Sequence, residues 1–129
     1  MEGNTVERRV ELAAVPAAVW QALTRGAELS AWFGAHVDME ARPGGRATFR
    51  WPDGRQRDAR VEVFDGERQL LLRWLPFERS VDGTTNVKPP GHIRFVLEPL
   101  GDRTALTVTE TLLGEERAMT MAGSGDSRS

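Results

Sequence analysis

The sequence of 129 residues contains no cysteine, no tyrosine and only two histidines. The lack of cysteine excludes disulfide bonds, thiolate catalysis and cysteine-bound metal ions. Neither sign of charge prevails, because 17 Lys and Arg residues stand against 19 Asp and Glu residues, which gives a formal net charge of -2. Proteins that bind nucleic acids are typically basic, so we expect no nucleic-acid partner. The sequence indicates no metal ion and no cofactor.

Long apolar runs are also missing. No stretch approaches the roughly 20 apolar residues that a membrane-spanning helix needs. Met1 is followed by Glu2, Gly3 and Asn4 rather than by the basic and then apolar run of a secretory signal. We therefore expect a cytoplasmic protein without a membrane partner. Its single domain should occupy residues 1–113, followed by a short helical turn and a disordered Gly/Ser tail at 114–129.

Two short helices are expected near the N-terminus. Pro16 suits the first helical turn, where its missing N–H has no intrahelical partner, and Val19, Trp20 and Leu23 then follow at helical spacing. A second short helix is expected at 28–33, ending on Trp32 and Phe33 before a glycine that favours a helix end.

Most of the remaining chain alternates between apolar and polar residues, which predicts strands. The expected strands are 6–12, 35–41, 46–51, 56–64, 69–77, 92–98 and 104–111. Hairpin turns rather than helices separate the later strands, so the pairing should be antiparallel. Segment 69–77 is apolar on both faces and should be central, whereas 78–90 shows no period and is expected to be a mobile loop.

The apolar phase of these elements predicts the core. The residues expected to be buried are Val10, Leu12, Trp20, Leu23, Phe49, Val61, Leu72, Phe95, Leu97, Leu106 and Val108.

This order of elements resembles the helix-grip architecture of the START-like (SRPBCC) superfamily of polyketide cyclases and pollen allergens. More narrowly, the sequence is similar to the family named after the activator of the heat-shock protein 90 ATPase. The stretches that carry the likeness are 16–23, 29–33, 43–46, 53–54, 70–74 and 107–110. The resemblance implies an α+β fold, in which a curved antiparallel sheet of about seven strands grips the helices. The family normally ends in a long C-terminal helix, whereas 114–121 suffices here for only two helical turns.

The inward-facing aromatic residues are the main candidates for a binding site. Phe49, Trp51, Trp74 and Phe95 fall in the inward phase of different strands, and each alone is explained by core packing. As a set, and together with the pair at 32–33, they also suit an apolar cavity between sheet and helices. The candidate ligand-binding residues are Trp32, Phe33, Phe49, Trp51, Arg57, Trp74 and Phe95, with loop 78–90 as a gate. No catalytic and no metal-binding residue is assigned.

The charged candidates are fewer. Arg8 and Arg57 lie in the inward phase of their strands, and we expect both to reach the sheet edge, the alternative being contact with an acidic group of a ligand. His36 and His92 should face solvent. Arg57 with Glu110 is the one inward ionisable pair that the pattern suggests for an enzyme.

The resemblance and the aromatic residues together favour non-catalytic binding of a small hydrophobic molecule, which is also what members of this superfamily commonly do. One alternative is a co-chaperone-like protein with a chaperone partner and a role in the stress response, as the family's name implies. Another is a cyclase or hydrolase that uses an acid in the cavity. Because 115–122 is too short to cover the sheet, a homodimer through the open sheet face is a further expectation.

Overall fold

In the computed structural model the described residues, 4–25, 30 and 34–112, form one curved antiparallel sheet with helix α1 beside it. The elements are β1 (Asn4–Leu12), α1 (Pro16–Thr24), β2 (His36–Met39), β3 (Arg46–Arg50), β4 (Gln56–Asp65), β5 (Gln69–Arg79), β6 (Thr85–Val87), β7 (Gly91–Leu100) and β8 (Arg103–Leu112). The predicted α+β helix-grip fold is thereby confirmed.

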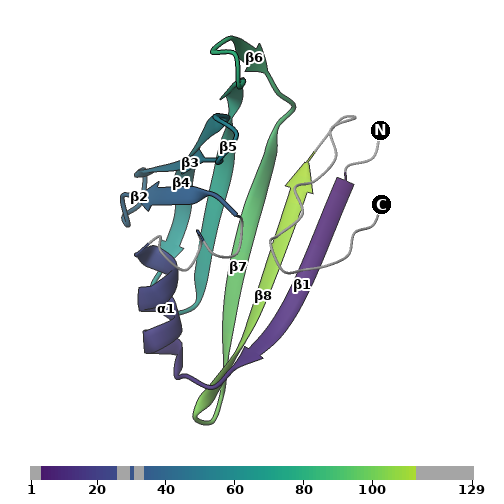
Figure 1. Cartoon of the computed structure of the whole chain (residues 1–129). Helices are drawn as coiled ribbons and strands as arrows, with labels where there is room; N and C mark the ends of the chain where they lie inside the picture. The colour runs from purple at the N-terminus through teal and green to yellow at the C-terminus, as the bar shows by residue number, and fades with distance from the viewer. Residues whose placement is uncertain (1–3, 26–29, 31–33, 113–129) are drawn as a thin grey trace.

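The strands follow the order β1-β8-β7-β5-β4-β3-β2, and β6 pairs with β5 outside this path. All pairs are antiparallel. Strand β5 lies at the middle of the order, as its two apolar faces predicted (Figure 1).

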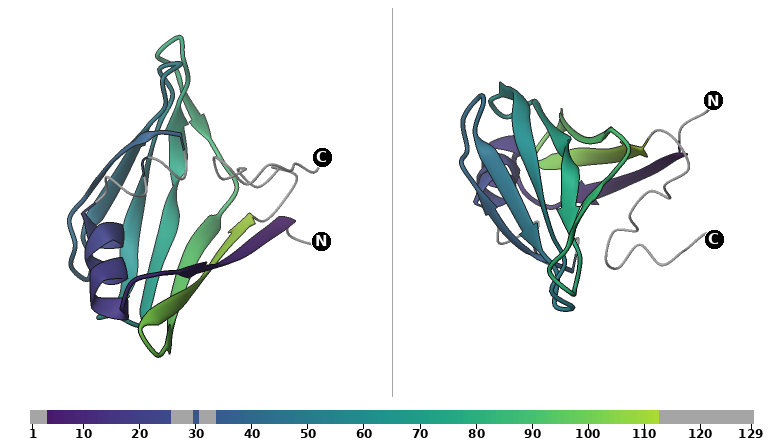
Figure 2. Two further views of the ribbon diagram at one scale, coloured as in Figure 1. Left: turned by 60° about the horizontal axis from the view of Figure 1, so that its bottom comes forward. Right: turned by 90° about the horizontal axis from the view of Figure 1, so that it is seen from above.

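The sheet bends into two limbs. Seen from above, β1 and β8 form one limb and β2 to β5 the other, with α1 within the curl (Figure 2). Helix α1 begins with Pro16 in its first turn and contacts β7 and β8. It buries Val19 and Leu23, and the ring of Trp20 lies 5.1 Å from that of Phe64. The inner side of the sheet is therefore where a site between sheet and helix would lie.

The core consists of the inward-facing residues of the strands. Eight of the predicted core residues are buried, namely Leu23, Phe49, Val61, Leu72, Phe95, Leu97, Leu106 and Val108. Burying one such side chain contributes roughly 1.5–3 kcal/mol to stability. The prediction of full burial is wrong for Val10, Leu12 and Trp20, which are only partly buried against the same core. Val10 and Leu12 lie on β1, which stands at the end of the strand order and, among the described strands, pairs with β8 alone.

Segment 78–90, predicted to be a loop, is largely a hairpin. Strand β5 continues to Arg79, and β6 pairs with it so that Phe77 faces Val87. In the turn, the Ser80 N–H donates to the carbonyl oxygen of Thr84 at 2.8 Å. The three residues of β6 are too few to show an alternating pattern, which is why the sequence predicted a loop there.

Two predicted segments cannot be compared with the structure. The second helix at 28–33 and the C-terminal segment from 114 lie outside the described residues, apart from Ser30. The hydroxyl oxygen of Ser30 accepts a hydrogen bond from the N–H of Val37 at 2.9 Å, which ties Ser30 to β2.

Gly45 provides a direct test of the turn between β2 and β3. A Cβ atom added there would clash with the backbone carbonyl oxygen of Glu40, whereas one added at Gly66 would meet nothing within 4 Å. We expect Gly45→Ala to lower the free energy of unfolding by about 1–3 kcal/mol, because the backbone must move to admit the methyl group. Gly66→Ala is the matched control and should change it little. Urea denaturation of both variants measures the difference, and equal stabilities would contradict this account of the turn.

Candidate functional site

Four of the predicted site residues, Phe49, Trp51, Arg57 and Trp74, come together near the end of the sheet where β5 pairs with β6. Phe95 lies apart from them, because it faces Leu70 at the other end of β5. Of the seven, Trp32 and Phe33 lie outside the described residues. Phe49, Arg57, Trp74 and Phe95 are buried and Trp51 is partly buried.

Three aromatic rings form the centre of this arrangement. The ring of Phe49 on β3 lies 4.8 Å from that of Trp74 on β5, at a tilt of 60°. The Phe49 ring also stacks with that of Trp51, with 6.0 Å between centroids and 23° between planes. Such ring pairs contribute roughly 0.5–1.5 kcal/mol beyond their buried area. Phe95 on β7 belongs to the same buried core.

An arginine lies at each end of this row of rings. The guanidinium carbon of Arg57 lies 5.0 Å from the Trp74 ring centroid, and that of Arg55 lies 4.8 Å from the Trp51 centroid. Both distances suit cation–π attraction, which is stronger at the buried site. We call Arg55, Trp51, Phe49, Trp74 and Arg57 the aromatic–arginine row. Its rings, two of them buried and that of Trp51 partly buried, lie between two positive charges.

The expectation that Arg57 reaches the sheet edge is wrong, because its side chain is only 3% exposed. Its Nε and Nη2 donate to the carbonyl oxygen of Leu75 at 3.2 and 3.1 Å, and Nη2 also donates to that of Pro89 at 3.2 Å. These hydrogen bonds offset the cost of removing the guanidinium from water. Arg8, by contrast, is partly buried on the edge strand β1, in agreement with the prediction.

A bulge in β5 provides the carbonyl groups that Arg57 needs. Arg57 faces Glu78 and Ala59 faces Trp74, so 75–77 on β5 lie opposite Asp58 alone. This segment contains Pro76, which has no N–H to donate to a neighbouring strand. The carbonyl oxygen of Pro76 accepts a hydrogen bond from the Lys88 N–H at 2.9 Å. A proline within an apolar strand was the sequence signal for this bulge.

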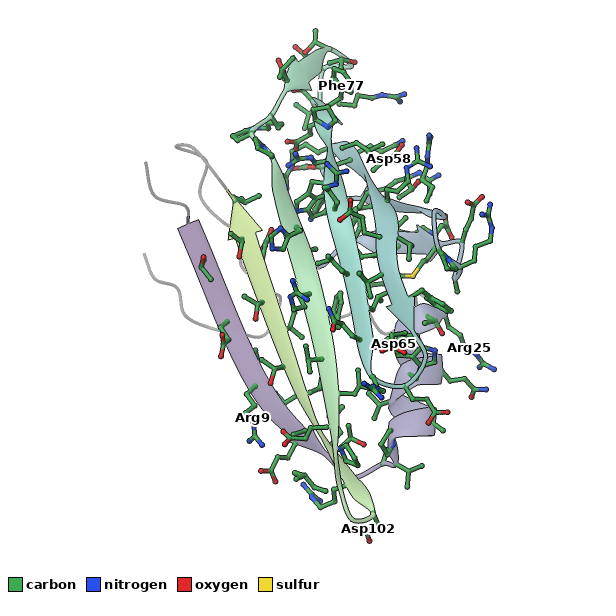
Figure 3. All side chains as sticks on the ribbon, turned by 180° about the vertical axis from the view of Figure 1, so that it is seen from behind. Arg9, Arg25, Asp58, Asp65, Phe77 and Asp102 are labelled. Carbon is green, nitrogen blue, oxygen red and sulfur yellow. The ribbon has the colours of Figure 1, made fainter. Side chains whose placement is uncertain are left out.

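A pocket of about 160 Å³ lies beside the bulge. It is lined by Gln56, Arg57, Asp58, Leu75, Phe77, Arg79 and Thr85. Figure 3 views this end of the sheet from behind, with Asp58 and Phe77 labelled. The lining is mostly polar, so this pocket differs in character from the aromatic–arginine row.

Charged residues that the sequence did not single out surround the row. The Glu78 carboxylate lies 3.5 Å from the Lys88 ammonium and 3.7 Å from the Arg55 guanidinium. Arg55 and Arg57 are two positions apart, a spacing that places both on one face of a strand and could have revealed Arg55. Glu78 and Lys88 lie in the segment predicted to be a loop, where no pattern indicated them.

Hydrogen bonding lowers the pKa of two exposed aspartates in turns at this end. The Arg55 backbone N–H, followed in effect by its side chain, holds the pKa of Asp53 below its ordinary value, with contacts of 3.0 and 2.9 Å. The backbone N–H of Thr84 has the same effect on the pKa of Asp82. Asp53 thus orients Arg55 towards Trp51 while remaining ionised.

Glu110, Arg57 and His36 are the residues to consider for catalysis or metal binding. Glu110 on β8 is fully buried and faces Ile93 across the strand pair, and Arg57 is buried as described above. His36 is exposed, and its imidazole lies 3.4 Å from the Asp38 carboxylate. Within the described ranges, His, Asp and Glu side chains nowhere gather in threes as they would around a metal ion. The same ranges contain no helix with the length and hydrophobicity needed to cross a bilayer.

The model of one protein family matches the chain. Its description is "Activator of Hsp90 ATPase homolog 1-like protein", and the match covers residues 13–127. None of the curated proteins matches the chain.

Solved structures share the fold. CalU16 from Micromonospora echinospora aligns with a TM-score of 0.63 and 21% identity, over 86% of this chain and 62% of that one. DynU16, described as a putative protein in the dynemicin biosynthetic locus, aligns with a TM-score of 0.64 and 24% identity, over 88% of this chain and 39% of DynU16. The Aha1 dimer from Colwellia psychrerythraea aligns with a TM-score of 0.63 and 22% identity, over 86% of this chain and 78% of the Colwellia chain. The chain thus spans less than two thirds of the length of CalU16 and DynU16.

The two arginines of the row allow a matched test of the buried one. In Arg57→Met we expect the free energy of unfolding to fall by roughly 2–4 kcal/mol, because the carbonyl groups of Leu75 and Pro89 lose their donor. Arg55→Met removes an arginine that also covers a tryptophan but is 40% exposed, and should cost less than about 1 kcal/mol. Chemical denaturation of both variants measures the contrast. A similar loss in both would contradict the role given to Arg57.

Proposed function

The chain belongs to the family of Activator of Hsp90 ATPase homolog 1-like proteins, and on that premise we propose that it binds a small hydrophobic molecule between the curved sheet and its helix. The binding is non-catalytic. The proposed lining is the set predicted from the sequence, Trp32, Phe33, Phe49, Trp51, Arg57, Trp74 and Phe95.

The aromatic–arginine row is the observation that carries this proposal. Its rings come from separate parts of the chain, and they are held in one arrangement by ring contacts and by the hydrogen bonds of Arg57. Binding sites for small molecules are typically apolar, with a few polar groups in fixed positions. Trp51 is only partly buried, so its ring is the part of the row that a ligand reaches first.

An enzyme of the cyclase or hydrolase type is the alternative use of the same space. It would need Glu110 as the acid, with Arg57 as the neighbouring cation suggested by the sequence. Arg57 already donates to the carbonyl groups of Leu75 and Pro89, a structural role that favours binding. Recovery of the bound molecule unchanged by mass spectrometry supports binding, and its conversion would favour the enzyme.

Tryptophan fluorescence during titration with a fatty acid such as oleate tests the proposal. We expect saturable quenching, with a smaller quenched fraction in Trp51→Phe and in Trp74→Phe because these rings lie in the proposed site. Trp20→Phe is the matched control, since Trp20 lies on α1 against Phe64, and it should keep the response. Trp74→Ala should also lower the free energy of unfolding by ~3–5 kcal/mol, because the ring is buried. Quenching that ignores both Trp51 and Trp74 would remove the site assignment.

Partner binding is a second candidate, because apolar side chains are exposed on the β5–β6 hairpin. Phe77 and Val87 face each other there and are 55% and 77% exposed. Phe77 lies beside β6 at the end of the sheet (Figure 3). Adjacent exposed apolar residues are typical of interaction surfaces, and the Colwellia protein is described as a dimer. We propose this hairpin, in addition to the open sheet face, as the surface that meets a second copy or a chaperone.

Sedimentation velocity at micromolar concentration tests this candidate. We expect the chain to associate with itself, or with the Hsp90 of its own host when that protein is added. The double change Phe77→Ser with Val87→Thr should abolish either association, because it removes the exposed apolar surface. Val96→Thr alters an exposed valine on β7 and is the control. A monomer that sediments unchanged with Hsp90 would exclude this candidate.

A further inference from the structure

The indole N–H of Trp74 is a buried donor that has no acceptor among the described residues. The side chain is 3% exposed, and Nε1 makes no hydrogen bond within the described part of the chain. Folded proteins pair nearly all of their buried donors, because an unpaired one loses its water without replacement. An acceptor on a bound molecule would pair this N–H.

The surroundings of Trp74 limit what that acceptor can be. The Arg57 guanidinium lies over the ring, and positive charge nearby favours an electron-rich oxygen over a second donor. Ala59 on β4 faces Trp74 on β5, and Ala47 on β3 faces Ala59. The residues in line with Trp74 on β4 and β3 thus carry only methyl groups, and the ring of Phe49 contacts the indole. Small side chains next to large rings suit a flat molecule.

We infer that the ligand is a flat, largely apolar molecule that carries a carbonyl oxygen, and that Trp74 Nε1 donates a hydrogen bond to this oxygen. The inference rests on the proposed function, which it extends from hydrophobic molecules in general to one chemical class. The aromatic rings supply affinity for the flat body. The N–H supplies orientation and selection, because a ligand without an acceptor leaves it unpaired.

Two probes of matched shape test this selection, 9-fluorenone and fluorene. They share one flat skeleton, and fluorenone carries a carbonyl oxygen at the carbon where fluorene carries two hydrogens. The carbonyl group makes fluorenone the better hydrated of the two, so unspecific partition into an apolar site would favour fluorene. We expect equilibrium dialysis to show fluorenone binding about 5- to 30-fold more tightly, as one hydrogen bond to a buried donor implies.

The variant Trp74→Phe keeps an aromatic ring and removes the N–H. It should reduce the preference for fluorenone to within about twofold while still binding fluorene, because the apolar contacts remain. Trp20→Phe is the control and should keep the preference. The nitrogen-15 spectrum of the unaltered protein provides an independent measurement, in which the indole N–H resonance of Trp74 should move downfield with fluorenone and not with fluorene.

The outcomes separate this inference from the proposed function. If both probes bind but fluorene binds equally well or more tightly, the inference is overturned and hydrophobic binding stands. If the preference survives in Trp74→Phe, or the indole resonance does not respond, the acceptor is recognised elsewhere and the inference also fails. If neither these probes nor oleate bind, the proposed function fails, and this inference fails with it.

Discussion

The burial of one guanidinium group determines how this end of the sheet is built. Arg57 is held by the carbonyl groups of Leu75, which lies in β5, and of Pro89, which lies between β6 and β7. A buried charge without such partners would be strongly destabilising. The bulge in β5 and the path of the chain into β7 are therefore linked through a single side chain, and the position of Trp74 beside them is linked as well.

This link explains why the site contains both apolar and charged groups. Towards the helix, the inner side of the sheet is closed by residues such as Leu72, Phe95 and Leu106, which are fully or almost fully buried. Towards β6, Glu78, Lys88 and Arg55 form ion pairs around the rings. The aromatic–arginine row spans the boundary between these regions. A molecule bound there would have its apolar part towards the core and its polar atoms towards the charged end.

The sequence predicted the fold well wherever alternation was strong. Phe49, Leu72 and Val108 follow a regular inward phase, and their burial was predicted correctly. The burial of Arg57 could not be predicted in this way, because it depends on carbonyl groups 18 and 32 positions along the chain. The burial of Trp74 followed from the pattern. Its unpaired N–H could not be predicted, because that depends on neighbours in space.

The outer face of the sheet provides an argument about where binding takes place. A row of basic residues crosses it, since Arg46 faces Arg60, Arg60 faces Arg73 and Arg73 faces His92. Like charges that face one another across strands are unfavourable. Ion pairs of Arg46 with Asp58 at 3.3 Å and of Arg73 with Glu62 at 2.6 Å offset this repulsion.

The charges that look scattered along the sequence are thus ordered into a balanced, solvated surface. Such a surface has little affinity for an apolar molecule, because binding there would remove charged groups from water without burying much apolar area. The inner side has the opposite properties: the rings of Phe49 and Trp74 are already shielded from water, and the Trp74 N–H, unpaired among the described residues, loses nothing further when a ligand covers it. The same alternation that makes the sheet fold therefore also separates its two faces by the kind of partner each can accept.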